Sequence, residues 1–156
     1  MILLTVISIV LFLAVMWMPK KIPYLEMYTT YFFTAFLATM SDVYLDAKYN
    51  LYGFFGKGVD LEYIPIFVII YPAYSLLIVN FYPYNKPIYR KVRYLLIWCA
   101  VTLVFEYASL FTNIFYYNAW KFWYSIICYP VINALILLNV KVTRNLSNGR
   151  KLFLKK

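Results

Sequence analysis

The chain has 156 residues, of which 65% are hydrophobic, 22% aromatic and 13% charged. A soluble domain of this length carries about 25% charged residues, so this chain lacks the polar surface that a soluble globule needs. Histidine is absent, which excludes the Ser-His and Cys-His arrangements of many hydrolases. The composition therefore predicts an integral membrane protein.

Neither metal nor cofactor binding is indicated by the remaining reactive residues. The only two cysteines, Cys99 and Cys128, each lie inside an apolar run. Cysteines in this setting are typical of small buried hydrophobic side chains. We therefore expect no disulfide scaffold, no metal site and no cofactor.

Five runs nearly free of charge have about the 20-residue length with which a helix crosses roughly 30 Å of hydrocarbon. They predict an all-α bundle of five transmembrane helices, which forms one domain over residues 1–140 and precedes a basic tail at 141–156. The first run lacks the basic start and the A-x-A-like site of a signal peptide, so we expect it to be retained. The predicted spans are 1–19, 27–46, 63–82, 94–113 and 122–140.

The positive charges predict the orientation. Twelve of the 15 Lys and Arg residues lie in the first loop, the third loop and the tail. Because cytoplasmic loops are rich in Lys and Arg, the amino terminus is expected outside and the carboxyl terminus in the cytoplasm of a cell-membrane protein. The basic residues alternate with spans, so we expect the tail to contact anionic lipid head groups and expect no nucleic acid partner.

Tryptophans near the predicted helix ends are typical of residues that anchor a helix at the membrane interface. Trp17, Trp120 and Trp123 are interpreted in this way, and stacking on a ligand is the alternative for Trp120 and Trp123. The glycine-rich segment 51–60, LYGFFGKGVD, lacks the spacing of a phosphate-binding loop. It predicts a flexible aromatic loop at the outer interface, or alternatively a lid over an outward-facing pocket.

Two acidic residues fall inside predicted spans, where ionisable groups are costly and often functional. Glu106 follows Arg93 by 13 residues, which places it roughly 20 Å into the fourth span. Asp42 follows Glu26 by 16 residues, or roughly 24 Å along the second span. The two carboxylates are therefore expected at a similar depth in the outer half of the bundle.

Two prolines point to the same depth. Pro72 and Pro130 each follow a tyrosine, Tyr71 and Tyr129, and a proline cannot donate to the carbonyl four residues earlier. The freed carbonyls belong to Val68 and Ile126. A candidate site for a polar solute is therefore formed by the following residues: Asp42, Tyr71, Glu106 and Tyr129.

Structural roles are the alternative for these residues. Asp42 and Asp46 then lie at the wet end of a helix, and Glu106 pairs with Lys121 or donates as a neutral acid to Asn113. A further alternative takes Asp42 and Asp46 as a D-x-x-x-D pair that holds Mg²⁺, although the second acidic motif of such transferases is missing.

The order of proline, tryptophan and glutamate in the second half resembles a known family. The stretches FYPYNKPIYRKVRYLLIW, FEY and YYNAWKFWYS, with the Tyr129-Pro130 pair, are similar to an uncharacterised family of small multi-pass membrane proteins from spore-forming Firmicutes of the Bacillus and Clostridium type. The likeness covers about residues 42–141, and where several members carry a histidine this chain has Asn139-Val140-Lys141. The resemblance implies a multi-pass architecture and no reaction. The matching positions are Pro83, Trp98, Glu106, Trp120, Trp123, Ser125 and Pro130.

The sequence thus favours a non-enzymatic membrane protein, either an accessory or structural subunit or a protein that binds a small solute. A cation- or proton-coupled transporter that uses Glu106 is the first alternative, and a Mg²⁺-dependent transferase that uses Asp42 and Asp46 is the second. A membrane-protein partner or a homo-oligomer is expected, because five helices make a small bundle.

Overall fold

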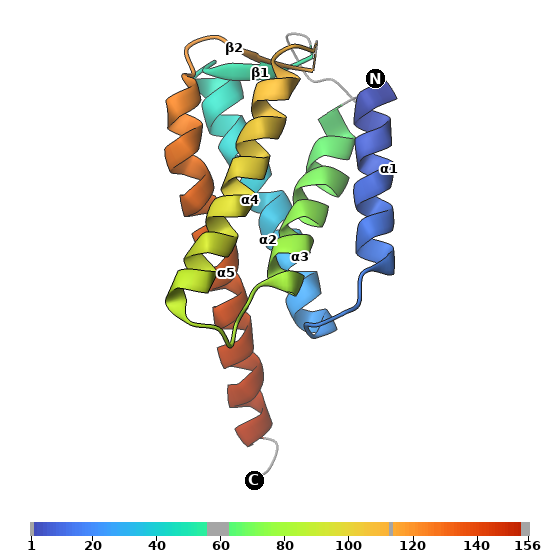
Figure 1. Cartoon of the computed structure of the whole chain (residues 1–156), viewed down its shortest axis with the longest axis vertical. Coiled ribbons are helices and arrows are strands. Elements are labelled where there is room, and N and C mark those ends of the chain that lie inside the picture. The colour runs from blue at the N-terminus through green and yellow to red at the C-terminus, as the bar shows by residue number, and fades with distance from the viewer. Residues whose placement is uncertain (1, 56–62, 113, 154–156) are drawn as a thin grey trace.

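The computed structural model describes residues 2–55, 63–112 and 114–153. Its five α-helices run alternately up and down, and a short two-stranded ribbon covers the end of the bundle where the amino terminus lies (Figure 1). The carboxyl terminus lies at the opposite end. The expectation of an all-α architecture is confirmed, with the ribbon as an addition.

The helices begin and end near the proline-containing loops. Pro23 and Pro87 immediately precede α2 and α4, where a missing backbone N–H costs nothing. The short π-helix η3 leads into α3, and Pro72 stands in the first turn of α3. The elements in chain order are α1 (Ile2–Trp17), α2 (Tyr24–Asp42), η1 (Val43–Lys48), β1 (Tyr52–Phe54), η3 (Ile66–Ile70), α3 (Tyr71–Phe81), α4 (Ile88–Ser109), β2 (Phe115–Tyr117) and α5 (Phe122–Phe153).

The last helix differs from its predicted extent. α5 runs from Phe122 to Phe153 with Pro130 inside it, so the predicted tail begins within this helix and is not a separate segment. At 1.5 Å per residue α5 is about 48 Å long, which exceeds the roughly 30 Å of hydrocarbon in a bilayer. Its last turns extend past the other helices (Figure 1).

The centre of the bundle is formed by α2, α3 and α5, with α1 packed on α3 and η3 and with α4 packed on α5. The apolar core of the bundle is small and lies toward the end of the bundle opposite the ribbon. One cluster of buried core residues consists of Ile22, Val79, Ile136 and Val140, and other buried apolar residues, such as Leu76 and Ile78, are not part of it.

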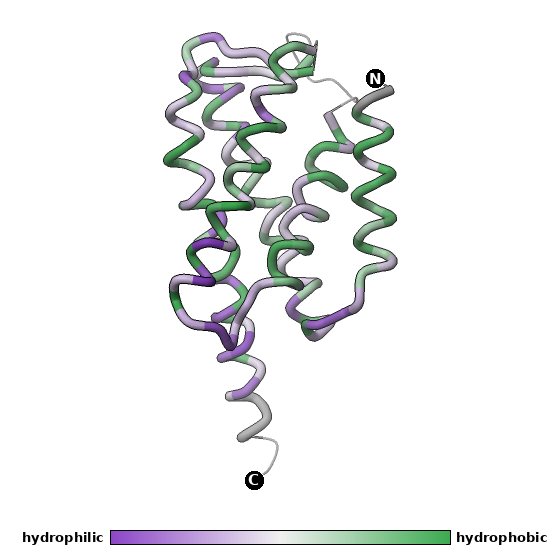
Figure 2. Tube along the Cα trace, viewed as in Figure 1, coloured by the Kyte–Doolittle hydropathy of each residue, from purple (hydrophilic) through white to green (hydrophobic). Residues whose placement is uncertain are grey.

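Large apolar side chains lie exposed on the outer faces of the helices. Among the described residues, Ile88–Ser109 and Phe122–Gly149 are long and apolar enough to cross a membrane, and Leu4–Trp17 and Ile66–Phe81 are shorter apolar helices. Only 11% and 22% of an 18-residue window in each of these two longer helices is buried, whereas the core helix of a soluble protein would be mostly buried. Hydrophobic residues fill the middle of the bundle and hydrophilic ones gather at its two ends (Figure 2).

The ribbon replaces part of the predicted flexible loop. In β1 and β2, which are antiparallel, Tyr52 lies opposite Tyr117 and Gly53 opposite Tyr116. A Cβ atom at Gly53 would collide with the end of the Tyr116 side chain, so a larger residue there requires that side chain to move. Residues 56–60 of the predicted loop lie outside the described residues.

The carbonyl of Leu51 ties the ribbon to the start of α5. It accepts the backbone N–H groups of Asn118, Ala119 and Trp120 at 2.9, 2.9 and 2.7 Å. Segments more than 60 residues apart in sequence are therefore fixed to each other at the ribbon end.

Candidate functional site

Glu106 lies near the ribbon end of α4, and both of its carboxylate oxygens accept hydroxyl groups. Its side chain is 8% exposed. Oε1 accepts the Ser125 hydroxyl at 2.6 Å and also the Tyr117 hydroxyl, and Oε2 accepts the Tyr129 hydroxyl at 2.6 Å. Because Tyr117 belongs to β2 and the other two donors belong to α5, Glu106 joins three elements. We call Glu106, Tyr117, Ser125 and Tyr129 the Glu106 cluster.

Trp120 extends this cluster toward the other half of the ribbon end. Its indole N–H donates to the Ser125 hydroxyl at 2.9 Å, and its ring meets the Tyr52 ring edge-on, with centroids 5.5 Å apart. Trp120 is partly buried and its indole N–H has a partner within the protein, and its role as an interface anchor stays a prediction. Trp17 and Trp123, at 80% and 52% exposure, have the exposure that an interface anchor requires.

Asp42 forms a second carboxylate centre at the end of α2. Its Oδ1 accepts the Tyr52 hydroxyl at 2.6 Å, and its Oδ2 accepts the Tyr63 hydroxyl. Tyr52 lies in β1, and Tyr63 lies just before η3. Asp42, Tyr52 and Tyr63 are called the Asp42 cluster below.

The two clusters meet through the ribbon. Tyr52 and Tyr117 are directly opposed across the two strands, and each donates to the carboxylate of its own cluster. Tyr71 lies within electrostatic range of both Asp42 and Tyr129. The structure thus brings Asp42, Glu106 and Tyr129 to the ribbon end in two neighbouring clusters, with Tyr71 close to both.

The tyrosines of the ribbon act as hydrogen-bond donors over the whole physiological pH range. Burial, followed by the negative charge of Asp42, raises the pKa of Tyr52 above the ordinary value for tyrosine. Burial, followed by the hydrogen bond to Glu106, does the same to the pKa of Tyr117. Both phenols therefore stay protonated, and each donates, as a neutral group, to the carboxylate of its own cluster.

Metal binding at Asp42 and Asp46 finds little support in the geometry. Among residues 2–55, 63–112 and 114–153, no group of three or more His, Cys, Asp or Glu side chains could hold a metal ion. Both oxygens of Asp42 already accept tyrosine hydroxyls, so Mg²⁺ would have to displace them. Asp46 lies in the π-helical segment η1, outside the regular turns on which the i, i+4 argument depends.

Glu106 has other partners than the two that the sequence suggested, and one of the two freed carbonyls has a partner within the chain. The donors to Glu106 are Tyr117, Ser125 and Tyr129, in place of Lys121, and Asn113 lies outside the described residues. The Val68 carbonyl accepts the Tyr31 hydroxyl at 2.8 Å, so it is used in helix packing. The Ile126 side chain lies half exposed on the outer surface of α5.

A third carboxylate centre, at the opposite end of the bundle, was not predicted. Glu26 is 5% exposed and receives two hydrogen bonds of 2.8 Å from the Arg144 guanidinium. This guanidinium also stacks on Tyr84, with 3.9 Å to the ring centre. The centre joins α2, α5 and the loop between α3 and α4. We call Glu26, Arg144 and Tyr84 the Arg144 clamp.

Comparison of the chain with models of known protein families, with characterised proteins and with solved structures finds no match. The geometry of the three carboxylate centres is therefore the basis for the functional proposals that follow.

Proposed function

We propose that the chain is an integral membrane protein with five spans, whose ribbon lies outside the cell membrane and whose basic end lies in the cytoplasm. The alternating helix directions, the exposed apolar faces and the charge distribution support this arrangement. The two short apolar helices are compatible with it, because a bilayer thins locally or flanking lysines extend to the interface around a short span.

Within that framework we propose a non-enzymatic role, as an accessory or structural subunit. The observation that carries it is the occupation of both outer carboxylates by hydroxyl groups of the chain itself. A catalytic acid or a solute-binding carboxylate needs an oxygen that can reach another molecule. Here every oxygen of Asp42 and Glu106 already accepts a hydroxyl of the chain, and one oxygen of each accepts a ribbon tyrosine, so the two clusters are suited to holding a rigid outer surface.

Partner recovery tests the accessory role. The tagged full chain would be purified from its native cells in a mild detergent, and mass spectrometry would measure the ratio of any accompanying membrane protein to the chain. We expect one partner at a fixed ratio, recovered again when that partner carries the tag. Purification of the chain as a monodisperse species without a partner would contradict the proposal, and a second copy of the chain would replace it by a homo-oligomer.

A second candidate, proton or cation translocation, is favoured by a line of buried hydroxyls. Thr30, Thr34 and Ser75 are 0%, 5% and 1% exposed, and within the described residues their hydroxyl oxygens have no hydrogen-bond partner. An unpaired buried hydroxyl costs about 1–3 kcal/mol, and ordered water is the usual way to remove that cost.

These hydroxyls lie between the two ends of the bundle. Thr30 and Thr34 follow Glu26 at intervals of four residues on α2, so each side chain neighbours the next along the helix, whereas Asp42 lies about 160° round the helix from Glu26. Ser75 comes from α3, which packs on α2. Water at these hydroxyls would lead from the Arg144 clamp toward the Asp42 cluster, which lies about 24 Å from Glu26 along the axis of α2.

Flux into vesicles tests this second candidate. The full chain would be reconstituted into liposomes that contain a pH-sensitive dye, and a pH step would be applied. Translocation predicts a flux that Thr34→Val lowers and that Thr39→Val leaves unchanged, because the Thr39 hydroxyl already donates to the Ala35 carbonyl. A wild-type flux equal to that of empty liposomes would exclude this candidate.

A further inference from the structure

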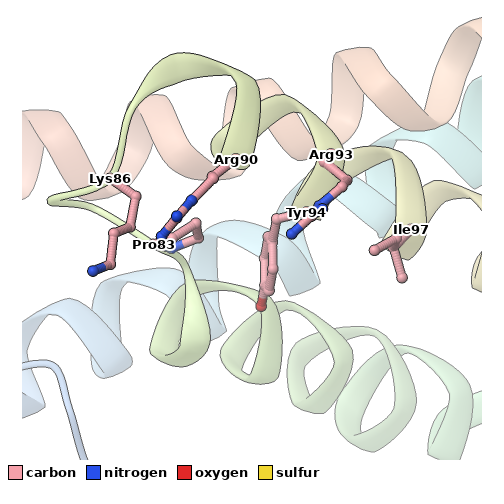
Figure 3. A pocket seen from close by; sticks show the side chains of 6 residues that line it. All are labelled: Pro83, Lys86, Arg90, Arg93, Tyr94 and Ile97. Atoms are coloured by element: carbon pink, nitrogen blue, oxygen red, sulfur yellow. The ribbon is translucent and has the colours of Figure 1, made fainter.

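A basic pocket opens at the end of the bundle opposite the ribbon. Its volume is about 300 Å³, and Figure 3 shows Lys86 at one end of it and Ile97 at the other, with Arg90 and Arg93 between them. Pro83 and Tyr94 complete the lining. It lies between the loop from α3 to α4 and the first turns of α4.

The walls of the pocket are held by contacts with the rest of the protein. The Tyr94 hydroxyl donates to the Ile78 carbonyl of α3 at 3.0 Å, and the Lys86 backbone N–H donates to the Pro83 carbonyl at 3.1 Å. The intervals between Arg90, Arg93 and Ile97 place these side chains on one face of α4. The fold therefore places the backbones that carry the three exposed cations close together, and the Arg90 Nε–H donates to the Tyr89 hydroxyl at 3.0 Å.

Within residues 2–55, 63–112 and 114–153, no ion pair joins one of the pocket's three cations to a carboxylate. The ion pair within the described part of the chain joins Arg144 to Glu26, and that pairing uses both oxygens of Glu26. Asp42 and Glu106 are engaged at the ribbon end. Three clustered cations repel one another and attract an anion, for which the planar guanidinium of arginine is suited to bidentate binding of a phosphate.

The end of the pocket away from Lys86 is apolar. Ile97 is 56% exposed and Leu96 beside it is 58% exposed, and both lie on the part of α4 that we propose to enter the membrane. A ligand that fits both ends carries a phosphate next to a hydrocarbon chain. Basic pockets at the cytoplasmic side of membrane helices are known to bind such head groups.

We propose that the pocket of Lys86, Arg90 and Arg93 binds the phosphate of an anionic phospholipid. The choice of a lipid over a free phosphate rests on the proposed membrane location, while the anion site itself rests on the cations of the pocket. This assigns the main lipid contact to the loop between α3 and α4, whereas the sequence predicted it for the tail. Arg144, which belongs to the predicted tail, is instead committed to Glu26.

Lipid titration of the purified full chain tests this inference. The chain in a neutral detergent would be titrated with short-chain phosphatidylglycerol, phosphatidylcholine and inorganic phosphate, and native mass spectrometry would give the affinity for each. We expect phosphatidylglycerol to bind most tightly, and we expect Arg90→Gln with Arg93→Gln to weaken it at least roughly tenfold. Arg90→Lys with Arg93→Lys retains the charge and should restore most of the binding.

The matched control removes two positive charges outside the pocket, by Lys91→Gln with Lys141→Gln, and should change the affinity less than about twofold. An equal loss in both double variants would overturn the proposal in favour of general charge attraction. Inorganic phosphate that binds as tightly as phosphatidylglycerol would overturn the lipid assignment. Circular dichroism confirms that each variant is folded. Because the titration is done in detergent, its result is independent of the number and direction of membrane spans.

Discussion

The two ends of the molecule hold their buried carboxylates by different chemistry. At the ribbon end, Asp42 and Glu106 accept hydrogen bonds from neutral hydroxyls. At the opposite end, Glu26 accepts two from the Arg144 guanidinium, and that end also carries most of the chain's positive charge.

The difference shows how a chain with six acidic and fifteen basic residues can hold buried carboxylates at both ends while it keeps most of its positive charge at one end. Hydroxyl donors fix a carboxylate at the ribbon end without a cation, and most of the positive charge stays at the opposite end. The arginine donor instead neutralises a buried acid in a region already rich in cations. The predictions below are ordered by expected effect and probe this contrast.

Breaking the Arg144 clamp is expected to have the largest effect. Arg144→Ala leaves Glu26 buried without a counter-charge, and because the Arg144 side chain is 34% exposed we expect the lower part of the usual range, a loss of about 3 kcal/mol. Unfolding by sodium dodecyl sulfate in mixed micelles would measure it. Lys141→Ala, which removes an exposed cation of the same helix, is the control and should change stability by less than about 0.5 kcal/mol. A loss that does not exceed the control would show that the clamp is not structural.

Removing the carboxylate of the Glu106 cluster should cost less. Glu106→Leu leaves the hydroxyls of Tyr117, Ser125 and Tyr129 without their acceptor, and we expect a loss of about 2 kcal/mol. Glu106→Gln keeps one acceptor oxygen, so its loss should be smaller in the same unfolding assay. If the glutamine variant were the less stable of the two, the charge of Glu106 and not its position would be the important property.

The two ribbon tyrosines test whether the outer clusters act together. Tyr52→Phe and Tyr117→Phe each remove one hydroxyl donor, with an expected loss of about 1 kcal/mol. Because these residues are directly opposed in the ribbon, the double variant should deviate from additivity by about 0.5 kcal/mol or more. Tyr44→Phe, at an exposed position, is the control. Strict additivity would mean that the ribbon does not couple the clusters.

Alkaline pH should slightly lower the stability of the end of the bundle that holds the Arg144 clamp. Burial raises the pKa of Tyr84 to about 12, against the lowering effect of Arg144. Since the folded pKa lies above the unfolded value of 10, this contribution to stability is complete below pH 10 and is lost as the pH rises toward 12. The melting temperature, measured between pH 9 and pH 12, should therefore fall less steeply with pH for Tyr84→Phe than for the parent chain. Identical slopes would remove Tyr84 from the account of the clamp.

The helices and the acidic positions could be predicted from sequence, because both depend on local patterns. Runs of apolar residues identify the helices, and Glu106 and Asp42 stand out against an apolar background. The end of α5 is not predictable in this way, because the positive residues after Val140 predict a tail and in the structure continue the same helix.

The donors were missed for a different reason. With 18 tyrosines in the chain, nothing local distinguishes Tyr52, Tyr63 and Tyr117 from the others. The ribbon pairs strands of three residues from distant loops, and Arg144 meets Glu26 across 118 positions. Such pairings depend on helix packing. The aromatic run at 115–117, which favours a strand, was the one usable local signal.

Labelling of single cysteines in intact cells tests the central claim most directly, namely that the ribbon and the end of α5 lie on opposite sides of a membrane. In a background with Cys99 and Cys128 replaced by alanine, Ala119→Cys marks the exposed end of the ribbon and Asn148→Cys marks the exposed end of α5. A membrane-impermeant maleimide should label Ala119→Cys in intact cells and Asn148→Cys only after permeabilisation. Labelling of both positions in intact cells, or release of the chain from membranes by alkaline carbonate, would contradict the five-span account.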